Sequence, residues 1–262
     1  MLSARRVTPD KRTNGGFKPM SKTIAFIFGL VSYLVFFFTF LYAIGFVGNL
    51  VVPKSIDSGT VESFAVSLVI NLVLLCIFAI QHSVMARPGF KRWWTKFVPE
   101  SVERSVYVLL ASLALLLLFW QWRPMPDVIW SVENRVGYFI LEAVFFAGWL
   151  IVLLSTFMIN HFDLFGLRQV YLHQRGEKPE DLGFRTPAFY KLVRHPIMVG
   201  FLIAFWAAPV MTAGHLLFAV VTTAYILVAV QLEERDLTRA HGETYEKYRS
   251  RVGMFLPLPK KG

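Results

Sequence analysis

The chain has 262 residues, of which 55% are hydrophobic, 16% aromatic and only 17% charged. A soluble domain of this size is about a quarter charged, so this composition is that of a membrane protein. A single cysteine excludes a disulfide framework and a cysteine-cluster metal site. The net charge of +10 would suit nucleic-acid binding only if the basic residues gathered on one soluble face, and they lie instead between apolar runs.

Apolar runs long enough to cross a bilayer occur four times, at about residues 23–48, 63–86, 105–122 and 136–160. A further apolar stretch from Pro196 to Leu232 is too long for one span. Pro209 and Gly214 are expected to divide it into two short helices or a hairpin. The sequence therefore predicts an all-α, polytopic integral membrane helix bundle with five to six transmembrane helices.

The basic segment before the first span has no short apolar core followed by a small-residue cleavage site, so we expect it to be retained. Residues 1–22 are predicted to form a disordered basic tail, and residues 23–262 a single membrane-embedded domain. The sequence gives no sign of an internal repeat.

The lysines and arginines are distributed unevenly between the two sides of this predicted bundle. In a six-span arrangement, 24 of the 27 fall on the side that holds both termini and only three fall on the other. The positive-inside rule then makes both termini cytoplasmic, and attraction to anionic lipid accounts for the rest of the basic excess. The asymmetry favours an even number of crossings, although a hairpin that enters the bilayer only part way would give the same distribution.

Polar residues gather at the cytoplasmic ends of two predicted spans. Gln81 and His82 end the second span, and Asn160, His161 and Asp163 end the fourth. Ionisable groups at membrane depth usually face a protein interior or a cavity, so these side chains are candidates for one pocket. For His82 a structural histidine bonded to backbone remains an alternative, and for His161 with Asp163 both a structural and a catalytic role remain open.

The string Arg194-His195-Pro196, with Gly200 four residues beyond the proline, marks the start of the next helix. Proline favours the first helical position, where free backbone N–H groups and the helix dipole attract an anion. Arg194 adds a full positive charge, and Gly200 would let a planar ligand approach the backbone. A basic pair before a membrane helix is also common without any binding role.

Two acidic residues, Glu233 and Glu234, follow the last apolar run at an end where carboxylates oppose the helix dipole. Either the helix continues to about Ala240 with Gly242 as its C-terminal cap, or the pair binds a cation or ribose hydroxyls. A zwitterionic ligand with an extra positive charge would suit acidic and basic groups brought together by the hairpin. S-adenosylmethionine has this charge pattern.

These C-terminal residues resemble a known family over about residues 183–257: Arg194-His195-Pro196, Gly200, Glu233-Glu234, Gly242, Tyr245, Tyr248, Arg251 and Pro257. The family is that of the isoprenylcysteine carboxyl methyltransferases and related phospholipid methyltransferases. The resemblance implies an all-helical membrane methyltransferase that binds S-adenosylmethionine on its cytoplasmic side. The residues it assigns to cofactor binding are Arg194, His195, Pro196, Gly200, Glu233 and Glu234.

Two further strings, residues 81–88 and 160–169, resemble the bacterial methanethiol S-methyltransferases. This second resemblance covers most of the chain beyond residue 20 and implies conversion of methanethiol, a small volatile thiol, to dimethyl sulfide in the bacterial inner membrane. Gln81, Asn160 and Arg168 are then expected to contact the substrate.

An alkyl thiol must ionise before it can accept a methyl group, and its pKa is at or above about 8.5. We expect His161 or His82 to take the thiol proton, with Asp163 orienting the imidazole and Arg168 or Arg194 stabilising charge.

The same subgroup borders the NnrU-like membrane proteins and a haem-containing isomerase, which provides a rival interpretation. In it His82 and His161 would be axial haem ligands. An isomerase would have no evident need for the Arg-His-Pro string and the glutamate pair together. A scaffold or transporter is the other alternative, although the sequence lacks paired broken helices in corresponding halves.

Overall fold

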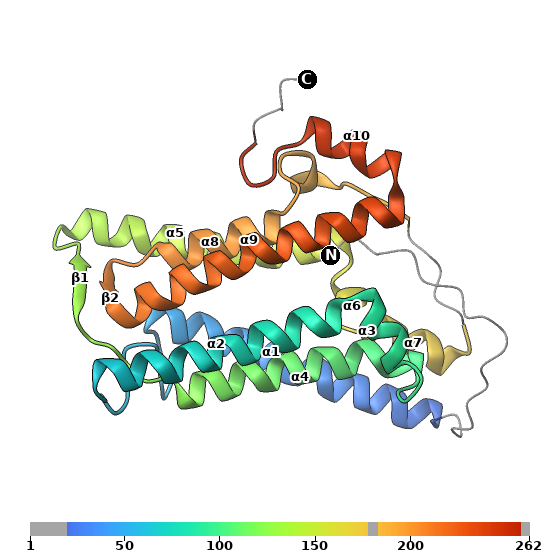
Figure 1. Cartoon of the computed structure of the whole chain (residues 1–262), viewed down its shortest axis with the longest axis horizontal. Helices are drawn as coiled ribbons and strands as arrows, with labels where there is room; N and C mark the ends of the chain where they lie inside the picture. The colour runs from blue at the N-terminus through green and yellow to red at the C-terminus, as the bar shows by residue number, and fades with distance from the viewer. Residues whose placement is uncertain (1–19, 178–182, 258–262) are drawn as a thin grey trace.

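The computed structural model describes residues 20–177 and 183–257 (Figure 1). The tail predicted for residues 1–22 therefore falls almost wholly outside the described residues. The described chain is mostly helical. In chain order its elements are α1 (Lys22–Gly48), α2 (Phe64–Ala86), α3 (Pro88–Trp94), α4 (Glu100–Gln121), β1 (Val128–Ser131), α5 (Arg135–Ile159), α6 (His161–Leu164), α7 (Leu167–Arg175), the 3-10 helix η1 (Ala188–Lys191), α8 (Pro196–Trp206), β2 (Val210–Thr212), α9 (Ala213–His241) and α10 (Glu243–Arg251).

The four predicted spans are confirmed as α1, α2, α4 and α5, and α9 is the fifth described helix with the length and hydropathy of a membrane span. Their boundaries agree with the apolar runs to within a few residues. α4 begins at Glu100, earlier than predicted, because hydrogen bonding continues the helix past the apolar run into charged residues. The chain is an integral membrane protein.

The stretch after Pro196 is divided as predicted, and of the two short helices or the hairpin expected there, only α8 is a short helix. α8 has 11 residues, about 16 Å, which is too short for a hydrocarbon core of about 30 Å. α9 has 29 residues, and the hydroxyl of Thr212 caps it by accepting from the backbone N–H of His215 at 3.1 Å. The charge distribution favoured an even number of crossings, and the described chain has five long helices with α8 as a part-length sixth.

A small antiparallel sheet, which the sequence did not predict, links β1 to β2 at the end of the bundle away from α3, α6 and α7 (Figure 1). Val128 pairs with Thr212 and Ser131 with Val210. The strands have only four and three residues, and β1 is exposed throughout, so no alternation of apolar and polar residues marks them in the sequence.

The helices form two layers (Figure 1). In one, α1 packs on α4 and α7, and α2 packs on α4; in the other, α5 packs on α8 and α8 on α9. The α5–α8 contact is very close, because a Cβ atom on Gly200 would lie 2.6 Å from the carbonyl oxygen of Gly148. Small residues permit such close helix packing in a membrane, where van der Waals contact drives helix association.

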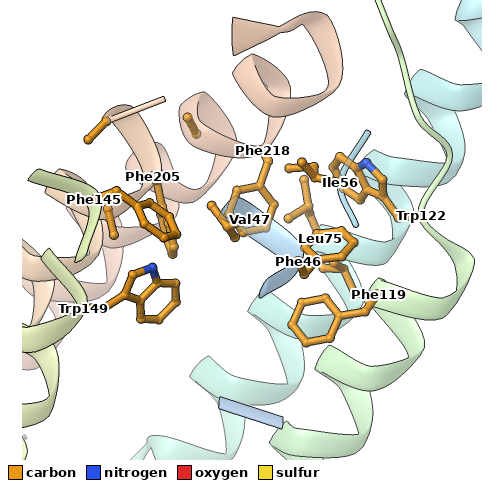
Figure 2. Close-up of a cluster of buried hydrophobic side chains, with 14 of the residues drawn as sticks. Phe46, Val47, Ile56, Leu75, Phe119, Trp122, Phe145, Trp149, Phe205 and Phe218 are labelled. Carbon is orange, nitrogen blue, oxygen red and sulfur yellow. The ribbon is translucent and has the colours of Figure 1, made fainter. Parts of the chain in front are cut away.

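An aromatic core joins the two layers toward the sheet end of the bundle. Figure 2 shows Phe145, Trp149 and Phe205 on one side and Phe46 and Phe119 on the other, with Phe218 between them. Edge-to-face contacts are common in this cluster: the rings of Phe205 and Phe218 lie 5.0 Å apart at 76°. This core holds the layers together at one end, and a cavity separates them at the other.

Candidate functional site

A cavity of about 1840 Å³ lies between the two layers and is lined by residues of all five long helices and α8. Seven of the twelve site residues predicted from the sequence line it: His82, Asn160, His161, Asp163, Arg194, His195 and Glu233. The other five do not: Gln81, Arg168, Pro196, Gly200 and Glu234. The expectation that polar residues at the ends of the second and fourth spans meet in one pocket is confirmed.

His161 begins α6, directly after α5, and both of its ring nitrogens have partners inside the protein. Nδ1 lies 2.8 Å from the hydroxyl of Thr156, and Nε2 lies 2.9 Å from the hydroxyl of Tyr33 on α1. The Thr156 hydroxyl donates its only hydrogen to the carbonyl of Leu153 at 2.7 Å, so it accepts from Nδ1–H. Nε2 then carries the lone pair and accepts from Tyr33. Burial lowers the pKa of His161, which keeps the ring neutral at pH 7.

The prediction that Asp163 orients His161 is wrong. Asp163 instead accepts from Gln169 at 3.1 Å and pairs with Arg168 at 3.3 Å, and Asn160 caps α6 by accepting from the backbone N–H of Asp163. Successive helical residues are rotated by about 100°, so two residues apart in α6 point in nearly opposite directions. Arg168, on α7, is held by this pair with Asp163 and does not line the cavity.

Aromatic rings surround His161 on several sides. Phe157 stacks on the imidazole with ring centroids 4.2 Å apart, and Phe165 lies edge-on at 4.8 Å. Phe36 of α1 stacks on Phe165 at 3.7 Å. Phe36 and Phe165 line the cavity and make its wall between α1 and α6 apolar around one neutral histidine.

His82, near the end of α2, faces the cavity beside Tyr107 of α4, which also lines it. The Tyr107 hydroxyl lies 3.1 Å from Nδ1 and 3.0 Å from Nε2 of His82. A single hydroxyl can hydrogen-bond only one of these nitrogens, either by donating to its lone pair or by accepting from its N–H. Arg104 lies over the Tyr107 ring at 5.2 Å and brings a positive charge to the same wall. The partner of His82 is thus a side chain, and the backbone partner considered from the sequence is not observed.

The Arg-His-Pro string starts a helix as predicted, since Pro196 is the first residue of α8 and His195 its N-cap. Arg194 is only 2% exposed and its guanidinium is used within the protein: Nε donates to Glu234 at 2.6 Å, and Nη1 donates to the carbonyls of Arg249 and Val252. His195 Nε2 lies 3.1 Å from the same Glu234 oxygen. Burial lowers the pKa of His195 even though Glu234 acts in the opposite direction.

Glu234 therefore holds the side chains of the site in place without lining the cavity itself. It holds Arg194 and His195 and also pairs with Arg249 of α10 at 3.3 Å, so one buried carboxylate ties α8, α9 and α10 together. The chain after α10 completes this arrangement, because the backbone N–H of Arg194 donates to the carbonyl of Gly253 at 2.9 Å. Glu233, its sequence neighbour, points into the cavity.

The prediction that Gly200 lets a ligand approach the backbone is wrong. Gly200 lies against Gly148 and Val152 of α5, so its missing side chain serves helix packing, and it does not admit a ligand. Gln81 also lies outside the cavity and donates to the sulfur of Met85 at 3.2 Å. These two placements depend on which face of each helix meets its neighbour.

The continuation of α9 past the glutamate pair is confirmed. The helix ends at His241, and Gly242, with φ of +52°, begins the turn into α10. Because Glu233 and Asp236 are one helical turn apart, both line the cavity, and Asp236 pairs with Arg87 of α2 at 2.8 Å. This pair bridges the two layers.

Sequence reasoning missed several cavity residues: Arg87, Arg104, Tyr107, Arg185, Tyr190 and Asp236. Only Arg87 carried a usable signal, because it belongs to the string of residues 81–88.

Comparison with known proteins gives the family. The NnrU protein family matches residues 70–253. Methanethiol S-methyltransferase of Mycobacterium tuberculosis is 60% identical over 92% of this chain and 99% of that protein. Methanethiol S-methyltransferase 1 of Bradyrhizobium diazoefficiens is 61% identical over 90% of this chain and 83% of that protein, and Nurim of Bos taurus is 31% identical over 71% and 74%. No solved structure matches.

Five long apolar helices around a cavity whose polar residues gather toward one end define a class, the polytopic helical membrane proteins with an internal ligand site. Within that class the chain belongs to the NnrU family, and there to the group formed by the methanethiol S-methyltransferases.

Proposed function

We propose that the chain is a methyltransferase that converts methanethiol to dimethyl sulfide with S-adenosylmethionine as methyl donor. The observation that carries this proposal is the shared cavity: Arg194 and His195, Glu233, and His82 come from three separate helical regions and line one space. Relatives that are 60% and 61% identical over 99% and 83% of their own length bear the name methanethiol S-methyltransferase.

The donor set around the cavity fits S-adenosylmethionine, which has a carboxylate, an ammonium, a sulfonium and ribose hydroxyls. Glu233 and His195 offer polar atoms at the start of α8, where Ile197 and Met198 bring the first helical turn to the cavity wall. Arg185 also lines the cavity, is exposed, and forms no ion pair with the part of the chain that the structure describes, so it suits the carboxylate. When bound, the donor supplies a methyl group on a positively charged sulfur.

We assign thiol deprotonation to His82 in preference to His161. Both nitrogens of His161 are hydrogen-bonded within the protein, whereas Tyr107 can engage only one nitrogen of His82. When the Tyr107 hydroxyl accepts from the nitrogen that carries the hydrogen, the other nitrogen keeps its lone pair and can accept a proton. Arg104 beside Tyr107 would stabilise the thiolate, a role first expected of Arg168 or Arg194. Arg168 pairs with Asp163, and Arg194 is neutralised by Glu234.

We propose that the end of the bundle that holds α3, α6 and α7 faces the cytoplasm of the bacterial inner membrane, with both termini there. This assignment rests on the distribution of basic residues and on the need of a water-soluble donor to reach the cavity. We treat residues 23–262 as one domain, in which residues 183–257 contribute most of the donor site.

The test is to supply purified protein with methanethiol and S-adenosylmethionine and to measure dimethyl sulfide in the headspace. We expect His82→Ala to lose at least about 100-fold in rate, as for a lost general base. His173→Ala, on α7 and outside the cavity, is the matched control and should keep its rate. Full activity in His82→Ala would refute the base assignment, and no dimethyl sulfide from the unaltered protein would refute the function.

Donor binding is tested separately with labelled S-adenosylmethionine. Glu233→Gln should bind it at least about tenfold more weakly, because the substitution removes a charge that faces the donor. Equal binding by Glu233→Gln and the unaltered protein would contradict the assignment of Glu233.

Haem ligation by His82 and His161 is not favoured by this geometry. Coordination by Nε2 of His161 would break its bond to Tyr33, and coordination by Nδ1 would break its bond to Thr156.

A further inference from the structure

The cavity is larger than a donor and methanethiol require. Pockets for drug-sized ligands measure roughly 300–1,000 Å³. The cavity has about 1840 Å³, which leaves roughly 800 Å³ beyond the upper end of that range. Along α4 its wall extends from Glu100 to Phe119, about 28 Å, so the additional space lies toward the aromatic core.

We call this inner part of the cavity the apolar lobe. Its walls are members of the aromatic core cluster that also line the cavity, several of them labelled in Figure 2: Val47, Leu75, Leu118, Phe119, Trp149, Phe205 and Phe218. The hydroxyls nearby are used within their own helices, since Thr39 donates to Val35, Ser112 to Val108 and Thr222 to Phe218. Hydrocarbon suits such a wall.

The lobe also reaches the lipid-facing surface between α1 and α5. Four lining residues are strongly exposed: Phe37 and Leu41 on α1 are 39% and 46% exposed, and Leu150 and Leu153 on α5 are 54% and 36% exposed. α1 packs mainly on α4 and α7, and α5 on α8, so these two edges face each other across the cavity. A side chain that both lines a cavity and is exposed to lipid marks a lateral opening.

Resting on the function proposed above, we propose that the substrate range extends to long-chain alkyl thiols that enter from the bilayer and place their hydrocarbon tail in the apolar lobe. The thiol sulfur forms a bond to the donor's methyl carbon, and the donor's carbon–sulfur bond breaks. The electron pair of that bond stays on the donor sulfur, which becomes neutral. The thiol proton passes to His82, and the product is an alkyl methyl sulfide.

The experiment compares methanethiol with decanethiol in proteoliposomes that contain S-adenosylmethionine, with methyl sulfides measured by mass spectrometry. Each methylene held in an apolar site strengthens binding about fourfold relative to water. Ala43 lines the cavity on α1, and Ala43→Trp fills the lobe. We expect this variant to raise the KM for decanethiol at least about tenfold and to leave that for methanethiol within about twofold.

Two further variants separate a specific effect on the lobe from a general loss of folding. Leu115→Phe narrows the lobe from α4 and should act in the same direction, whereas Ala147→Trp, at an exposed position of α5 that does not line the cavity, should act on neither thiol. Turnover of methanethiol without turnover of decanethiol, as when a phospholipid chain fills the lobe, would overturn the inference and leave the proposed function standing. Equal decanethiol KM values in all variants would also overturn it. Absence of both products would refute the proposed function itself.

Discussion

The hydroxyl of Thr156 accepts a hydrogen bond from Nδ1 of His161 at 2.8 Å while donating its own hydrogen to the carbonyl of Leu153. This relationship sets the tautomer of the histidine, because the hydroxyl has no second hydrogen to give. Nε2 is then the acceptor, and its partner is Tyr33 on α1. Through this one ring, the end of α5 in one layer is connected to α1 in the other.

Thr156→Val removes the acceptor and keeps the shape of the side chain. The N–H of His161, which is 5% exposed, loses its partner, and an unsatisfied buried polar group costs about 1–3 kcal/mol. We expect a lower unfolding temperature in detergent, measured by intrinsic fluorescence. Thr156→Ser, which keeps the hydroxyl, should stay close to the unaltered protein. Equal unfolding temperatures for the Thr156→Val and Thr156→Ser variants would show that this hydrogen bond does not stabilise the fold.

Glu234→Gln should be strongly destabilising. The carboxylate pairs with Arg194, His195 and Arg249, and removing one partner of a buried ion pair costs about 3–5 kcal/mol because a charge is left uncompensated. The measurements are unfolding temperature and affinity for labelled S-adenosylmethionine, both of which should fall. Glu243→Gln is the matched control, since its pair with Lys247 is exposed and contributes at most about 1 kcal/mol. Equal stability of the two variants would contradict the role of Glu234.

Gly200→Ala tests the contact between α5 and α8. The added Cβ would meet the carbonyl oxygen of Gly148 at 2.6 Å, so the helices must separate, and overpacking of this kind costs about 1–3 kcal/mol. Gly89→Ala on α3, where the nearest side-chain atom is 3.9 Å away, should be neutral or slightly stabilising. Thermal unfolding of both variants provides the measurement. A Gly200→Ala protein as stable as the parent would refute the packing role.

Acidification should destabilise the folded protein through its buried histidines. Burial lowers the pKa of His161 in the folded state, so below about pH 6.5 the unfolded chain binds a proton that the folded chain does not. The stability from the neutral ring is therefore complete above about pH 6.5 and is lost as the pH falls toward the folded pKa. His161→Gln should show a shallower loss of unfolding temperature between about pH 7 and 5 than the parent. Identical slopes would indicate that His161 does not contribute.

The sequence by itself determined the features that depend on local chemistry. Apolar runs identified α1, α2, α4 and α5. Lipid offers no hydrogen-bond partners, so the backbone of an apolar run that crosses the bilayer must pair its own N–H and C=O groups in a long helix. Pro196 marked the first residue of α8 and Gly242 the end of α9, since each residue type suits that backbone position. The strings around His82 and His161 indicated one pocket, and the cavity contains both.

Only the tertiary structure decided which side chain faces which. Glu233 and Glu234 are adjacent in sequence, yet one faces the cavity and the other is a buried support for Arg194, because neighbouring helical residues point about 100° apart. Gly200 belongs to a helix contact because Gly148 of α5 lies opposite it. Helix periodicity gives the angle between side chains, but the packing of one helix on another decides which direction is the cavity.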